Sequence, residues 1–535
     1  MLKFENKDKI LKEHNCLRIT LQEVFYYAFW GILLFAKGIG LYEGMLSFNI
    51  CILLALLFMG LKIVITGYTL YEWITILFMT ICSVFAYFQT GEKAAIITIL
   101  VIIGIKNIPV KRVMKLSFII WSITFYTMLI VHLLGLKEGV VLAHNKFGLG
   151  FILRYSLGFP HPNVLHISFI LWMALLLYLV SVDKRKLIKI SVFLFLENVF
   201  IFIFSVSITG FLIGMFYLIL NSYFTTKKKS FCLEKVVIQS VLPLCIFVSI
   251  VPPLIFKGKL YDIVNKILNT RLNIWKYYLL NFSPAPFGVK VYSPAEEVWS
   301  LDNSYLYLLY YYGWILFVIL LSLTSIVIWK YVKNNRKKEL MIIVGMLIAG
   351  ITEPYLFNFS FKNFILLFIG REMFNFFRTY NKREISLIRI RNRIITMPVI
   401  RFELYSSLRE MVNSFTYRRK IQMIVCEMII AFILVGNIFY LYQKPTCIYV
   451  QSNRCDYVKG EGSLYEEISD EPNVQIFGER DDNKTFYGFS GNMILLEFGR
   501  KILVYAVSGV ILGRELFILI CFIKNRKIEK REHST

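Results

Sequence analysis

The chain has 535 residues, of which 57% are hydrophobic, and its mean hydropathy is +0.61. Apolar runs of about 18 to 22 residues recur along most of it, the length with which an α-helix crosses a hydrocarbon layer about 30 Å thick. This composition excludes an ordinary soluble multidomain protein. The formal net charge of +25 lies mostly in short connectors between the apolar runs, so it predicts orientation in a membrane rather than binding to nucleic acid.

The apolar runs predict an all-α polytopic integral membrane protein with about 12 to 14 transmembrane helices and two long extracytoplasmic loops. If the chain starts inside, every strongly basic connector falls on the cytoplasmic side, as the positive-inside rule requires. The predicted spans, in chain order, are 24–41, 45–62, 69–88, 94–110, 116–136, 163–182, 187–205, 208–224, 236–256, 303–329, 340–357, 361–377, 421–442 and 494–523.

The chain divides near residue 380. We expect a cytoplasmic N-terminus at 1–23 and a dense membrane domain at 24–380, with external loops 137–162 and 257–302. After it come a basic cytoplasmic segment at 381–420, two further spans within 421–523 that flank an acidic external loop at 444–493, and a cytoplasmic tail at 524–535. Cys447 and Cys455 share that external loop and could form a disulfide. The cysteines and histidines show no metal-binding spacing.

Two polar segments precede spans on the external side. "RYSLGFPHPN", residues 154–163, carries Arg154 and His161 in a proline-restricted turn with Asn163 as the expected N-cap. "ILNTRLNIWKYYLLNFSPAPFG", residues 267–288, has apolar residues at helical spacing, which predicts an amphipathic helix on the outer surface with Arg271 available to bind an anion. Each segment also has a purely structural explanation that fits the local sequence equally well. The first would be a rigid turn, and the second would be a helix lying on the lipid surface.

A third polar segment opens the tenth predicted span, where Asp302 and Asn303 are expected to cap the helix. Glu296 and Glu297 precede it, and five tyrosines follow from Tyr305 to Tyr312, typical of an interfacial aromatic belt or, alternatively, of a platform for stacking sugars. Glu197, in the middle of the seventh predicted span, is expected either to be functional or to bond to Asn198 or another helix.

These segments resemble the signatures of bacterial O-antigen polymerases of the Wzy type and the related O-antigen ligases. "DNSYLYLLYYYG" fits the pattern H/D-N-x-x-L-x6-G, and "RYSLGFPHPN" is similar to R-x-x-L-G-F-x-H-P-N. "TEPYLFNFSFKNFILLFIG", residues 352–370, is similar to E-P-x-x-x-N-x-x-x-K-N-x-x-x-L-x-x-G. The resemblance covers roughly residues 20 to 380. Many ligases carry His at the position of Asp302, and the S-R-T-G-like turn of many polymerases here reads Ser207-Ile208-Thr209-Gly210, without the Arg.

The resemblance implies a membrane glycosyltransferase in the bacterial cytoplasmic membrane, with its active site facing outward. It would move a growing glycan from undecaprenyl diphosphate to a lipid-linked oligosaccharide repeat unit, needing neither metal nor cofactor. Asp302, Arg271 and Arg154 are the expected catalytic residues. The expected substrate-binding residues are His161, Asn163, Asn303, Tyr305, Glu353, Lys362 and Asn363.

Expected partners are undecaprenyl-diphosphate-linked oligosaccharides, membrane lipids, a chain-length regulator and a flippase. The first alternative is a ligase-like transferase that moves glycan to another acceptor. A more distant alternative is a flippase or transporter of lipid-linked oligosaccharides, for which an internal repeat and short loops would be expected.

Overall fold

A computed structural model shows how the chain folds. It describes residues 16–145, 151–180, 184–226, 231–268, 270–294, 299–358, 360, 362–380, 384–386, 394–398, 415–441, 448–451, 455–457, 474–477, 486–489 and 492–532. Glu296, Glu297 and Cys447 lie outside these residues, so the predictions made for them are not addressed.

Helices account for most of the described chain. They are α2 (Leu21–Gly38), α3 (Leu46–Ile65), α4 (Leu70–Thr90), α5 (Ala94–Gly104), α6 (Val110–Leu133), α7 (Pro162–Leu179), α8 (Lys184–Ser205), α9 (Ile208–Thr226), α10 (Cys232–Ile255), α11 (Gly258–Ile267), α12 (Arg271–Asn281), α13 (Ser304–Tyr307), the π-helix η1 (Leu308–Tyr312), α14 (Gly313–Lys333), α15 (Lys337–Ala349), the 3-10 turn η2 (Pro354–Leu356), α16 (Ile365–Tyr380), α18 (Tyr417–Leu441) and α20 (Asn492–Glu532).

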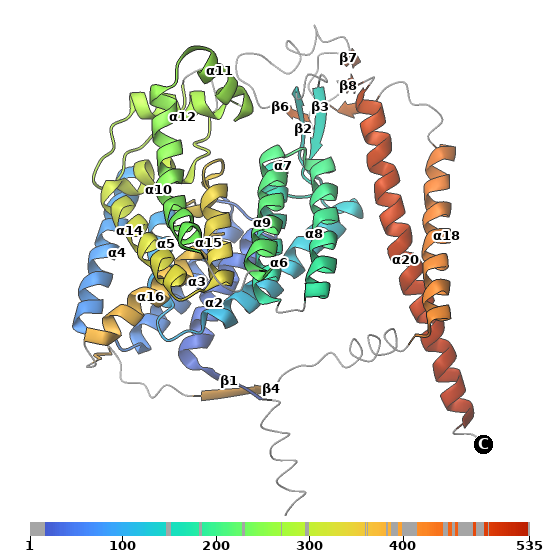
Figure 1. Ribbon diagram of the computed structural model, residues 1–535, viewed down its shortest axis with the longest axis horizontal. Coiled ribbons are helices and arrows are strands. Elements are labelled where there is room, and N and C mark those ends of the chain that lie inside the picture. The colour runs from blue at the N-terminus through green and yellow to red at the C-terminus, as the bar shows by residue number, and fades with distance from the viewer. Residues whose placement is uncertain are drawn as a thin grey trace, which may run out of the picture.

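Three small sheets lie at the ends of the helices. β1 (Cys16–Thr20) pairs with β4 (Ile394–Pro398), and β2 (Val141–Asn145) lies between β3 (Phe151–Tyr155) and β6 (Cys455–Tyr457). β8 (Phe486–Phe489) lies between β5 (Ile448–Gln451) and β7 (Val474–Phe477). The β1–β4 pair lies at one end of the helices, while α11, α12, β2 and β3 lie at the other (Figure 1). Charge bias predicts that the β1–β4 end faces the cytoplasm.

The structure confirms the expectation of a helical, multi-pass membrane protein. Within the described residues, ten helices are long and apolar enough to cross a membrane: α3, α4, α6, α7, α8, α9, α10, the continuous α13–η1–α14 segment, α18 and α20. α7 is the most enclosed, with α6, α8, α9 and α15 packed against it. Many residues of the other long helices are exposed and apolar, as expected of surfaces that face lipid.

Three predicted spans are shorter than the sequence suggested. The segments 94–110, 340–357 and 361–377 contain helices of 11, 13 and 16 residues. At about 1.5 Å per residue these reach roughly 17 to 24 Å, less than the hydrocarbon thickness. The span predicted over 340–357 is shorter because α15 stops at Ala349, and a connector that contains the 3-10 turn η2 then leads to α16.

The amphipathic helix predicted within 267–288 is α12, and a further helix, α11, precedes it. Thr270, with a φ of +65°, turns the chain between α11 and α12. The apolar residues Leu260, Ile263 and Ile267 of α11 are exposed, whereas Trp275 of α12 is buried. α11 therefore has the character expected of a helix lying at a membrane surface, whereas one face of α12 packs into the protein core.

The π-helix η1 ends at a glycine that the local geometry requires. Gly313 has a φ of +83°, and a Cβ there would overlap the carbonyl oxygen of Pro286 and the amide nitrogen of Gly288. Trp314 N donates to the carbonyl of Ala285 at 3.1 Å, which holds the two segments together. The final glycine of the D-N-x-x-L-x6-G pattern thus has a steric explanation.

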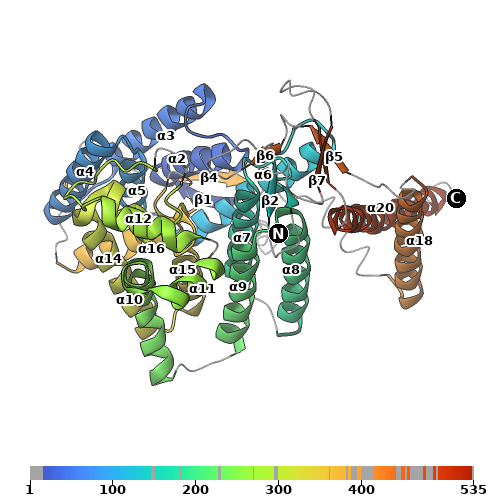
Figure 2. The same ribbon diagram turned by 90° about the horizontal axis from the view of Figure 1, so that it is seen from above.

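The two C-terminal helices form a hairpin at one side of the main bundle. Figures 1 and 2 both show α18 and α20 lying against one another and apart from α10 and α14. A Cβ at Gly509 would overlap the backbone of Ala431, and one at Gly513 would overlap that of Glu427. Small residues therefore allow the close approach of these helices, as is common in membranes.

We predict that Gly313→Ala destabilises the protein by more than about 2 kcal/mol, because the new methyl group meets backbone atoms at a positive φ. The matched control is Gly436→Ala in α18, where a Cβ meets nothing within 4 Å. Thermal unfolding of both variants in detergent tests this. An equal effect of the two substitutions would contradict the steric explanation.

Candidate functional site

Arg271 lies between two carboxylates at the α12 end of the bundle. It is the first residue of α12 and only 7% exposed. Its Nη2 lies 3.5 Å from Glu353 Oε1 and 4.0 Å from Asp302 Oδ2. The three residues come from segments well separated in the sequence, so the fold brings together two residues predicted to be catalytic and one predicted to bind substrate.

Asn303 caps α13 with its side chain. Its Oδ1 accepts from the amides of Tyr305 and Leu306 at 2.9 and 3.0 Å. Its Nδ2 donates to Ser249 Oγ and to the carbonyl of Ile351, both at 2.9 Å. With four hydrogen bonds and no exposed surface, Asn303 holds the site together from within the protein.

Asp302 does not share the cap, contrary to expectation. Its Oδ1 accepts from Ser300 Oγ at 2.6 Å, while Oδ2 faces Arg271. The Asp302 side chain is 31% exposed. A single side chain satisfies the first amides of α13, so Asp302 is left to face the arginine.

Glu353 is positioned by its backbone. Ser304 N donates to the carbonyl of Gly350 at 2.8 Å, and Ser304 Oγ donates to the carbonyl of Glu353 at 2.6 Å. Together with the bond from Asn303 to Ile351, these contacts attach the start of α13 to the connector between α15 and α16. The motif that begins at Asp302 and the motif that begins at Thr352 are therefore joined in one structural unit.

Arg154 lies in β3, is 5% exposed, and is held on two sides. Its Nε donates to the carbonyl of Ser205 at 2.8 Å, and its Nη2 donates to Asn163 Oδ1 at 2.6 Å. It lies within electrostatic range of both Glu353 and Arg271. Ser205 precedes the turn whose missing Arg distinguishes this chain from many polymerases.

Burial and charge act in opposite directions on the acids of this site. Burial raises the pKa of Glu353 above its usual range, because the charged form loses solvation, while Arg271 lowers it. The pKa of Asp302 shifts in the same direction for the same reasons. Burial lowers the pKa of Arg154 to about 10, which keeps the guanidinium charged at neutral pH.

Two buried donors on α12 have no hydrogen-bond partner among the described residues. They are Arg271 Nε and Trp275 Nε1, one helical turn apart. Unpartnered buried donors are uncommon in folded proteins and often lie where a ligand or water binds.

His161, rather than Asn163, caps α7. His161 Nδ1 accepts from the amide of Asn163 at 3.0 Å, and Pro162 occupies the first helical position. Asn163 is then free to use its own side chain as the acceptor for Arg154. The predicted cap was wrong by two residues because an imidazole can accept a hydrogen bond as an Asn does.

Lys362 and Asn363 lie at the other end of the connector. Asn363 caps α16, accepting from the amide of Ile365 at 3.0 Å and donating to the carbonyl of Leu356 at 2.8 Å. Lys362 is buried and within electrostatic range of Glu353. Its ammonium adds positive charge near Glu353 from the protein interior.

Most of the tyrosine run faces the protein core. Tyr305, Tyr310 and Tyr312 have no exposed surface, and the Tyr305 hydroxyl donates to the carbonyl of Leu347 at 2.7 Å. Tyr307 and Tyr311 are half-buried with ring centroids 4.4 Å apart. The aromatic-belt interpretation is wrong for the three buried rings.

A polar network below Arg154 was not anticipated from the sequence. His166 has its Nδ1 3.1 Å from Ser205 Oγ and its Nε2 2.9 Å from Asn198 Oδ1, inside the bundle. A Cβ at Gly210 would overlap the His166 ring. Glu197 instead accepts a hydrogen bond from Tyr126 of α6 at 3.1 Å, in line with the alternative of a bond to another helix.

The C-terminal hairpin supports the strand that carries Arg154. Arg500 of α20 is 1% exposed, pairs with Glu497, and donates to the carbonyls of Leu153 and Ile203, each at 2.9 Å. β6 also joins β2 in the same sheet. A charged pair three residues apart in an apolar run was the available signal, but the carbonyls that Arg500 binds lie far away in the sequence.

Scans against models of known protein families and searches of curated proteins and solved structures found no match to this chain. Among the residues that the structure describes, no three His, Cys, Asp or Glu side chains gather as a metal site would require.

We predict that Arg500→Met lowers the free energy of unfolding by about 3 kcal/mol, because Glu497 and two carbonyls lose a buried partner. Arg514→Met is the matched control, since Arg514 is exposed on the same helix. Thermal unfolding in detergent is the measurement. The assignment fails if the two variants unfold alike.

Proposed function

We propose that this protein is a polysaccharide polymerase of the outer face of the bacterial cytoplasmic membrane. It transfers a growing glycan from undecaprenyl diphosphate to a hydroxyl of the next lipid-linked repeat unit. The observation that carries the proposal is the convergence of Arg271, Asp302 and Glu353, with Arg154 nearby, at the end that charge bias places outside. The sequence resemblance supplies the substrate class.

The two guanidinium groups suit a diphosphate leaving group. An Arg donates two parallel hydrogen bonds to a phosphate and stays protonated, so it can stabilise the charge that develops as the glycosidic bond breaks. Arg271 and Arg154 lie on different external loops and approach Glu353 together. The unpartnered Nε of Arg271 is a donor available for such a ligand.

The carboxylates suit activation of the acceptor. In the transfer, the acceptor oxygen forms a bond to the anomeric carbon, the bond from that carbon to the diphosphate oxygen breaks, and a carboxylate takes the hydroxyl proton. Glu353 fits the role of base because burial raises its pKa towards neutrality, where a general base is most effective. Asp302, more exposed, then orients the acceptor.

The neighbouring α11 supports a lipid-linked substrate. Its exposed apolar residues suit a position at the membrane surface, and the helix ends at Ile267, four residues before Arg271. A site at that depth meets the diphosphate of a polyprenyl lipid while the glycan remains in water.

We predict that Arg271→Lys and Arg154→Lys each reduce polymerisation by at least about 100-fold, because an ammonium keeps the charge but loses the two-pronged contact with phosphate. The assay is a ladder of lengthened products from lipid-linked repeat units and purified protein. Arg336→Lys, at the opposite end of the bundle, should leave the ladder unchanged. Wild-type activity in either site variant would remove that arginine from the mechanism.

The same assay separates the alternatives. A ladder that survives chelation supports a polymerase that relies on guanidinium charge. Transfer of a single glycan to a foreign acceptor, without lengthening, would replace the polymerase proposal with the ligase alternative.

We predict that the acid limb of the pH profile of kcat/KM lies above the ordinary Glu pKa of about 4.3, since a base must be deprotonated and burial raises the pKa of Glu353. Glu353→Gln should abolish this limb along with most activity, while Glu339→Gln should retain both. An acid limb near 4 in the wild type would exclude Glu353 as the base.

A further inference from the structure

A second polar site lies at the β1–β4 end, away from Arg271. A cavity of about 530 Å³ opens there, lined by the start of α4, the residues that follow α5, the C-terminal half of α16 and Glu384. This volume falls within the roughly 300 to 1,000 Å³ of small-molecule sites. The basic connectors place this end in the cytoplasm.

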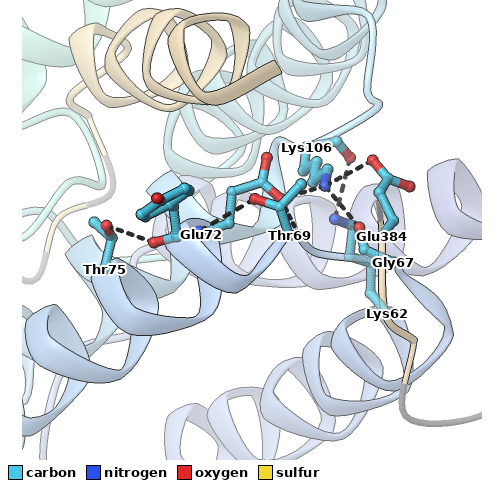
Figure 3. A network of polar contacts seen from close by, with 8 residues as sticks. Lys62, Gly67, Thr69, Glu72, Thr75, Lys106 and Glu384 are labelled. Atoms are coloured by element: carbon cyan, nitrogen blue, oxygen red, sulfur yellow. Dashed lines mark hydrogen bonds and ion pairs between the residues drawn. The ribbon is translucent and has the colours of Figure 1, made fainter. Parts of the chain in front are cut away.

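Lys106 is the central charge of this cavity. It is only 4% exposed. Its ammonium donates to Glu72 Oε2 at 2.5 Å and to the carbonyl of Gly67 at 2.7 Å, and it forms an ion pair with Glu384 Oε1 at 3.0 Å (Figure 3). Lys62, which is fully buried, donates to the carbonyl of Lys106 at 3.1 Å. Lys62 therefore supports the backbone at Lys106 from within the protein.

The two acids on Lys106 are held very differently. Glu72 is 2% exposed and forms a capping box with Thr69 at the start of α4, so it is part of the helix end. Glu384 is 42% exposed and comes from the short segment after α16, which is attached by backbone pairing between Tyr68 and Ile385. Glu384 is therefore the carboxylate that an incoming anion can replace.

Two arginines on one helix complete the positive lining. Arg371 donates through Nε to Glu372 at 3.0 Å and through Nη2 to the Tyr331 hydroxyl, which fixes its guanidinium plane at the cavity wall. Arg378 lies two turns further along α16, lines the cavity and is exposed. Arg and Lys at one cavity are the usual protein ligands of phosphate groups.

We propose that this cavity binds a phosphate ester, with the phosphate taking the place of the Glu384 carboxylate on Lys106 and contacting Arg371 and Arg378. A phosphate supplies more acceptor oxygens and more charge than the carboxylate that it displaces. Binding then releases the segment that begins at Glu384 from Lys106. The ligand is either the headgroup of an anionic phospholipid or a soluble phosphate ester.

The test measures binding by the full-length protein rather than activity, so it stands apart from the proposed function. One arm titrates glycerol 3-phosphate into protein in neutral detergent by calorimetry. The other compares thermal unfolding in phosphatidylcholine nanodiscs with and without phosphatidic acid. A response in the first arm identifies a soluble ester, and a response in the second arm alone identifies a lipid headgroup.

Two variants and a control decide where the phosphate binds. Arg378→Gln should raise Kd about tenfold, the effect of losing one charge-assisted hydrogen bond, and Glu384→Gln should lower Kd severalfold by removing the competing carboxylate. Arg418→Gln, an exposed arginine at the start of α18 on the same predicted side, should bind as the wild type does. No response in either arm, or equal binding by Arg378→Gln and Arg418→Gln, would overturn the proposal.

Discussion

A backbone group buried outside a helix must find another hydrogen-bond partner, and the start of the connector between α15 and α16 faces this requirement. Asn303 and Ser304 meet it by bonding to three carbonyls of the connector while also starting α13. The position of Glu353, and through it the ion pair with Arg271, depends on these bonds. The polar residues that begin α13 therefore hold in place the connector between α15 and α16.

Much of the architecture is encoded locally and could be predicted. Hydropathy located most of the long helices, because helix length and apolarity are properties of one segment. The three motifs were expected on one side of the membrane because charge bias fixes the side of every loop at once. Arg271 and Glu353 lie 3.5 Å apart at one end of the bundle, as that expectation requires, although no sequence spacing relates them.

What could not be predicted depends on geometry or on distant partners. The span predicted over 340–357 counted Leu356 and Phe357 as part of one helix, although Gly350, Glu353 and Pro354 interrupt the apolar run directly after Ala349. Asp302 takes no part in the cap because the Asn303 side chain alone accepts from two amides and donates to two further acceptors. Arg500 donates to the backbone of β3, and the sequence of α20 does not indicate which distant strand its arginine will bind.

The contact between Arg500 and Leu153 joins residues 347 positions apart. At translation rates of about 5 to 20 residues per second, the ribosome needs roughly 20 to 70 seconds to make the chain between them. The Arg154 strand is therefore among the last parts of the molecule to reach its final packing, long after α2 to α7 have entered the membrane. A chain that stops before α20 would insert its main bundle and still leave this strand without the anchor that holds it.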